Sequence, residues 1–98
     1  MITKQELNNK LTELYVVAPY FYNHNPYMLL IDDSARMFDL MIEHDIWVQP
    51  YHSLGFVYAH ARKDVIFDKV YFKDHESPQA SAKYAGAMAL VKLAESKL

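Results

Sequence analysis

The first apolar positions of the chain repeat with the period of a helix. Apolar or aromatic side chains recur three or four residues apart, or side by side, at Leu7, Leu11, Leu14 and Tyr15. This spacing gathers them on one face of a helix. Thr3 and Glu6 have the spacing of a capping box, in which the threonine hydroxyl accepts a hydrogen bond from the backbone N–H of Glu6. The pattern predicts a helix from Thr3 to Val17 or Ala18, ended by Pro19.

A second helix is predicted after two adjacent carboxylates. Either Asp32 or Asp33 can accept hydrogen bonds from the free N–H groups of a first helical turn. The apolar positions that follow form the expected buried stripe: Met37, Phe38, Met41 and Ile42. We expect this helix to end near His44.

Three short strands are predicted next. Residues that favour strands concentrate in two runs, 46–51 and 56–58, on either side of His52–Gly55, which has the composition of a hairpin turn. Pro50 has no N–H for a sheet ladder, so we expect the first run at an edge of the sheet. A third run, Val65–Phe72, alternates imperfectly and completes an antiparallel meander.

The last predicted helix has no polar face. Ser77 and Pro78 have the order of a cap followed by a first-turn proline. Beyond them, ten of the eleven residues from Tyr84 to Ala94 are apolar or small. Such a helix must be covered on every side. The sheet can cover one side, and the other side needs another helix, a second subunit or a foreign partner.

These elements predict an α+β fold with a single domain over residues 1–98. We expect a small sandwich of a three-stranded, mainly antiparallel sheet with three helices, in the order ααβββα. The last helix also predicts a two-fold homodimer, the commonest closed assembly. Its surface would use the apolar positions that the sheet leaves exposed, drawn from Ala85, Met88, Ala89 and Leu93. The alternative is that the first two helices cover that side.

The composition removes most kinds of catalytic site. The absence of cysteine excludes disulfides, thiolate metal sites and cysteine nucleophiles, and two glycines cannot build a phosphate-binding loop. His44, His52 and His60 lack the spacing of a metal centre, and the serines have no nucleophile context. We therefore expect no catalytic residue, no metal and no cofactor, and a protein that is not an enzyme.

The chain also lacks the sequence signals of a membrane or secreted protein. No run reaches the length of a membrane span, and the amino terminus has no apolar signal core. We expect a protein that acts in the cytoplasm of a cell.

The connection between the first two predicted helices is unusually aromatic. It contains Tyr20, Phe21, Tyr22 and Tyr27, with two prolines and several asparagines around them. Rings with polar tips dominate many binding hot spots, and prolines reduce the entropy that such a loop loses on binding. We therefore assign these four residues to partner binding. The alternative is that the rings simply roof the core through their apolar bodies.

Several short motifs between Asn25 and Leu98 resemble small uncharacterised phage and prophage proteins that carry a compact α/β sandwich domain. The motifs are Asn25-Pro26, Ile31-Asp32-Asp33 with Ala35, the strand Ile46-Trp47-Val48, and Ser77-Pro78-Gln79-Ala80 before an alanine-rich helix. The resemblance implies a phage or prophage origin, an accessory role toward a bacterial host, and no transferable catalytic residue.

Two functional hypotheses follow. The first is a protein-interaction module, such as a phage factor that binds and inhibits or redirects a host defence protein. The second is a nucleic-acid-associated regulator, because Arg62, Lys63, Lys69 and Lys73 cluster near aromatic residues that could stack on bases. The formal net charge of -2 and the interleaved aspartates argue against the second.

Overall fold

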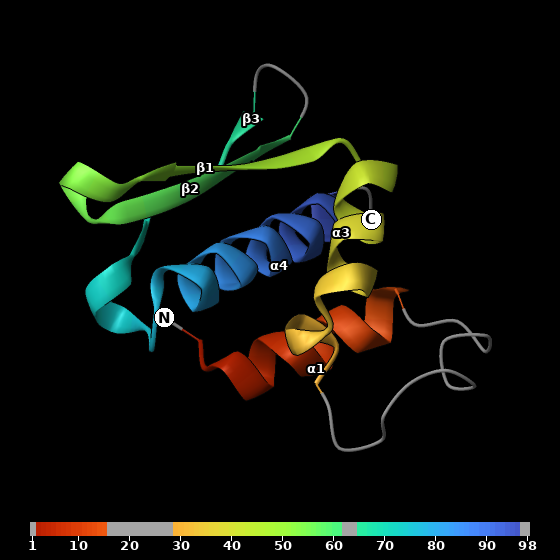
Figure 1. Cartoon of the computed structure of the whole chain (residues 1–98). Helices are drawn as coiled ribbons and strands as arrows, with labels where there is room; N and C mark the ends of the chain where they lie inside the picture. Colours follow the sequence, from red (N-terminus) through yellow and green to blue (C-terminus); the bar gives the residue numbers. More distant parts are fainter. Residues whose placement is uncertain (1, 16–28, 62–64, 97–98) are drawn as a thin grey trace.

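The computed structural model describes residues 2–15, 29–61 and 65–96, which form one sheet and three α-helices (Figure 1). The elements are α1 (Lys4–Tyr15), η1 (Leu30–Asp32), α3 (Ser34–Glu43), β1 (Ile46–Tyr51), η2 (His52–Leu54), β2 (Phe56–Ala61), β3 (Val65–Ile66), β4 (Val70–Tyr71), η3 (Phe72–Asp74) and α4 (Pro78–Ser96). The predicted α+β class and the order ααβββα are confirmed, with the third strand divided into two pieces.

The helices begin where the sequence predicts caps. The N–H of Glu6 donates to the Thr3 hydroxyl at 3.1 Å, and the N–H of Arg36 donates to the Asp33 carboxylate at 3.1 Å. The N–H of Ala80 likewise donates to Ser77 at 3.1 Å. Of the two carboxylates that could cap α3, Asp33 does so, whereas Asp32 forms a 2.6 Å ion pair with Lys4.

The hairpin formed by β1 and β2 follows the predicted pairing. Its register runs from Ile46 opposite Ala61 to Tyr51 opposite Phe56, and Trp47 faces His60 across the ladder. Gly55 ends the turn with a φ of 77°, in the left-handed region that glycine adopts without steric cost.

The third strand differs from the continuous run expected at Val65–Phe72. Both β3 and β4 pair antiparallel with β2, with Ile66 opposite His60 and Val70 opposite Val57. Three residues, 67–69, therefore lie opposite the two residues 58–59 of β2. One extra residue on one of two paired strands defines a β-bulge. The extra residue explains the imperfect alternation, because one more residue on one strand shifts the phase of the side chains.

The backbone groups of β1 that do not face β2 lie at an edge of the sheet that no other strand of the described residues pairs, here called the free edge. The N–H of Phe67 donates to the carbonyl of Ala59 at 2.9 Å, so Ala59 directs its backbone groups toward β3. Backbone groups alternate along a strand, so His60 directs its own toward β1. By the same alternation, Ile46, Val48 and Pro50 direct theirs outward, which confirms the predicted edge position of Pro50.

The chain's own elements cover α4 on two sides. Figure 1 shows the sheet on one side of α4 and α1 on the other, while α3 crosses near the carboxyl-terminal part of α4. Ala85 and Ala89 are buried at 2% and 0% exposure, and Met88 and Leu93 pack half-buried against the core. The first two helices thus take the covering role that the sequence left open, and Ala85 and Ala89 are not available as a dimer surface. Self-association remains a prediction.

One part of the expected core is wrong. Phe38 and Ile42 of α3 are 62% and 57% exposed, whereas Met37 and Leu40 are buried. The apolar positions of this helix span a wider arc than its neighbours can cover, and α3 turns Met37, Leu40 and Met41 toward the core.

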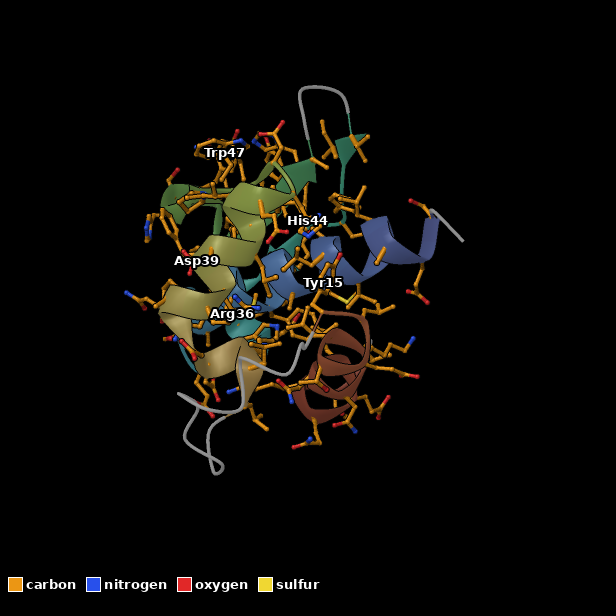
Figure 2. The ribbon with its side chains drawn as sticks, turned by 90° about the vertical axis from the view of Figure 1, so that its right-hand side faces the viewer. Tyr15, Arg36, Asp39, His44 and Trp47 are labelled. Carbon is orange, nitrogen blue, oxygen red and sulfur yellow. The ribbon has the colours of Figure 1, made fainter. Side chains whose placement is uncertain are left out.

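Three polar contacts hold α1 in place. The buried Asn8 accepts from the N–H of Ile31 at 3.0 Å. The Tyr15 hydroxyl donates to the carbonyl of Leu90 at 2.5 Å, where α1, α3 and α4 meet (Figure 2). The Tyr84 hydroxyl donates to the carbonyl of Ile2 at 2.7 Å. Burial, with a smaller contribution from nearby glutamates, raises the pKa of both tyrosines.

Candidate binding surface

The predicted partner-binding residues Tyr20, Phe21, Tyr22 and Tyr27 lie outside the residues that the structure describes. Their role therefore stays a prediction. The described residues contain a second concentration of rings, on the sheet itself.

Side-chain alternation gives the sheet two unlike faces. The residues of β2 that face α4 are small or β-branched and almost fully buried: Val57, Ala59 and Ala61. The opposite set is largely aromatic, and the pairing register adds neighbours from the other strands. We call this set the outer face: Trp47, Gln49, Tyr51, Phe56, Tyr58, His60, Ile66 and Tyr71.

No α-helix of the described residues covers the outer face, because α1, α3 and α4 all lie on the other side of the sheet (Figure 1). The exposed fractions are 57% for Trp47, 42% for Tyr71 and 69% for Ile66. Single exposed apolar side chains are normal on protein surfaces, but a continuous group of them marks an interaction site. The outer face is a candidate for such a site, because its members are register neighbours on paired strands. Four of its apolar side chains are exposed and two more are half-buried: Trp47, Tyr51, Ile66 and Tyr71, and Phe56 and Tyr58.

The rings of the outer face hold one another in position. Tyr51 stacks on Tyr58 with centroids 5.5 Å apart and an interplanar angle of 16°, and their hydroxyls lie 3.2 Å apart. Tyr51 also contacts Phe56 at 5.3 Å, and Phe56 meets Tyr71 edge-on at 6.0 Å. The hydrogen bond with Tyr51 raises the pKa of Tyr58. A surface ordered in this way loses little side-chain entropy on binding.

Among the described residues, charged groups lie at two margins of the outer face. The ammonium of Lys69 lies 4.7 Å from the centroid of the Phe56 ring, and that of Lys73 lies 5.8 Å from Tyr71. At the other margin the indole N–H of Trp47 donates to the Asp45 carboxylate at 3.0 Å. This bond fixes the tryptophan ring, and Asp45 itself adopts the left-handed conformation with a φ of 56°.

In the described ranges, no three histidine, aspartate or glutamate side chains are placed to hold a metal ion. The three histidines considered as ligands lie apart: His44 packs on Tyr15, His52 packs on Phe72, and His60 stands opposite Trp47. Nor is any helix of the described chain long and apolar enough to span a membrane.

The signal for the outer face is present in the sequence. Residues 56–61 alternate between a ring and a small or β-branched residue, which is the pattern of a strand with a tightly packed face and an aromatic face. The sequence favours the rings of residues 20–27 instead, because two prolines and several asparagines accompany them, which is the composition of a recognition loop.

Comparison of the chain with protein-family models, with curated protein sequences and with solved structures finds no match. The resemblance to phage and prophage proteins therefore stays a prediction.

Proposed function

We propose that the protein is a non-enzymatic binding module that contacts a partner protein through the outer face of its sheet. The observation that carries this proposal is the ordered, exposed row of rings that no described helix covers. Aromatic side chains that are already ordered give large contact area at low entropic cost, and they are enriched in the centres of protein interfaces.

A protein partner fits the composition of this surface better than a polyanion does. Ile66 has the largest exposed fraction among the large apolar residues of the outer face, and aliphatic contacts serve protein interfaces rather than bases. The formal net charge of -2 also gives the chain no general attraction for phosphate. The resemblance described above implies one form of this function, in which the partner is a bacterial host protein in the cytoplasm that the module inhibits or redirects.

The test compares single-ring variants for partner capture from a bacterial lysate. Trp47→Ala should lose the partner that the parent chain retains. Phe38→Ala is the matched control, because Phe38 is exposed to a similar extent but lies on α3. Tyr22→Ala tests the predicted aromatic connection separately, and it should retain the partner if the outer face is the binding surface. With the partner identified, Trp47→Ala should cost at least about 2 kcal/mol of binding free energy, the threshold of a hot spot.

Trp47 also provides a direct optical signal, because it is the only tryptophan in the chain. Partner binding over the outer face should shift or quench its fluorescence in the parent and in Phe38→Ala. Capture that is unchanged in Trp47→Ala, or binding without any change in this emission, would contradict the proposal.

A second function, binding of single-stranded nucleic acid, is favoured by the position of Lys69 and Lys73 against the rings of Phe56 and Tyr71. Lysines beside exposed rings are typical of surfaces on which successive bases stack. A titration with single-stranded oligonucleotides at rising salt separates the two functions. Affinity that falls steeply with salt supports nucleic acid, whereas no binding at low salt removes it.

A further inference from the structure

A small apolar cavity lies between the β-bulge and α4, on the side of the sheet opposite the outer face. Its volume is about 230 Å³. Its lining comes from the bulged segment and from one side of α4, and comprises Phe67, Asp68, Lys69, Val70, Tyr84, Ala85, Met88 and Lys92. We call this cavity the bulge slot.

The bulge and the small residues of α4 together account for the slot. A β-bulge bends the strand that carries the extra residue, and the slot lies directly against the bend at residues 67–69. On the opposite wall Ala85 presents only a methyl group. The half-buried side chain of Met88 lies between the two walls. Because it is unbranched and flexible, it can adapt its conformation to a ligand.

The size and lining of the slot suit an apolar group. An apolar cavity of about 150 Å³ is known to stay dry and to bind benzene, so the bulge slot has room for a ring or a short alkyl chain. The polar hydroxyl of Tyr84 is already bonded to the carbonyl of Ile2, which leaves the ring of this residue as part of the apolar wall.

Among the described lining residues, the ammonium of Lys92 is the one that can face a ligand in the slot, and its present partner is weakly held. The ammonium of Lys92 on α4 lies 3.4 Å from the carboxylate of Asp68 in the bulge, so this pair joins the two walls. The Asp68 side chain is 93% exposed, and such a pair contributes little to stability. The other lysine of the lining, Lys69, directs its ammonium over Phe56 on the outer face and not into the slot.

We propose that the bulge slot binds a small amphipathic carboxylate. The apolar tail lies between Phe67 and Met88, and the carboxylate replaces Asp68 as the partner of Lys92. This site is separate from the outer face, so its failure and the failure of the proposed function are distinguishable.

The test titrates the full chain with octanoate and follows the backbone amide signals by NMR. Saturable binding should shift the signals of residues 67–70 and 85–92. Acetate, which lacks the tail, should cause no saturable shift. The neutral analogue 1-octanol should bind more weakly than octanoate, because it cannot pair with Lys92.

Two variants and one control complete the design. Lys92→Gln should weaken octanoate binding about two- to fivefold, the effect of one partly exposed ion pair, and should leave 1-octanol binding unchanged. Met88→Trp should fill the slot and abolish the binding of both. Lys10→Gln, which removes an exposed lysine from α1, should change neither.

Each contrary result overturns the proposal. No saturable octanoate binding to the parent would remove the site, and octanoate binding that survives in Met88→Trp would place it elsewhere. Equal affinities for octanoate and 1-octanol, or an unchanged affinity in Lys92→Gln, would remove the carboxylate as the recognised group. If Met88→Trp fails to fold, Lys92→Gln still decides the question, because that position is partly exposed.

Discussion

Gly86 provides a sensitive test of how closely α4 approaches its neighbours. It lies in the middle of α4, where glycine costs about 1 kcal/mol relative to alanine. A Cβ atom at this position would lie 2.9 Å from the sulfur of Met41 and 3.7 Å from a methyl of Val48. The site is thus closed by α3 on one side and by β1 on the other. We predict that Gly86→Leu destabilises the protein.

The expected magnitude follows from these contacts. Overpacking of a closed site costs about 1–3 kcal/mol, and the better helix propensity of leucine returns up to about 1 kcal/mol. The net loss should be about 1–2 kcal/mol, which lowers the Tm of a domain of this size by about 5–15 °C. Gly86→Ala should be neutral or stabilising by up to about 1 kcal/mol, because the flexible thioether of Met41 can move away from one methyl group.

The assay is thermal and urea unfolding of four proteins: the parent, Gly86→Leu, Met41→Ala and the double variant. Removal of the Met41 side chain opens space on the α3 side, so Gly86→Leu should cost less in that background. We expect a coupling of at least about 1 kcal/mol, beyond the roughly 0.5 kcal/mol seen for independent sites. An unchanged or higher Tm for Gly86→Leu, or the absence of coupling, would refute the close approach of α4 to α3.

Three other predictions follow from single contacts. Asn8→Ala should cost about 1–3 kcal/mol in urea unfolding, because the N–H of Ile31 loses its buried acceptor; the exposed neighbour Asn9→Ala should have little effect. Tyr84→Phe should cost about 1 kcal/mol at neutral pH. Because the folded pKa of Tyr84 is raised above 10.0, the parent loses stability as the pH rises beyond that value, so its advantage over the variant should shrink there. Deletion of Asp68 should remove the bulge and merge β3 and β4 into one strand, without changing which residues face α4. Slower amide hydrogen exchange along the merged strand would confirm this prediction, and the spectrum of an unfolded protein would contradict it.

The elements that the sequence predicts correctly are those set by local chemistry. Thr3, Asp33 and Ser77 cap their helices as expected, because a side-chain oxygen at a helix start acts within one turn of the chain. The hairpin is equally local, since Gly55 permits the left-handed turn between two strand-forming runs.

The features that the sequence does not settle depend on contacts distant in the chain. The apolar arc of α3 is wider than the space available, and only the packing against α4 decides that Phe38 remains exposed. The bulge depends on how residues 67–69 meet β2, which no local signal fixes. Ala85 is buried on the side of α4 that faces the bulge, and a uniformly apolar helix does not indicate which of its sides the sheet covers and which side α1 and α3 cover.

Pro50 lies where it can limit aggregation, because the free edge of β1 runs beside the exposed rings of the outer face. An exposed edge can recruit the edge of another molecule and grow into a cross-β fibril, and aromatic stacking would favour that growth. At the free edge of β1 the outward backbone groups belong to Ile46, Val48 and Pro50, and the proline has no hydrogen to donate. An incoming strand would therefore lose a hydrogen bond at the hairpin end of its pairing. The proline thus makes fibril growth from this edge less favourable, although the rings of the outer face stay exposed.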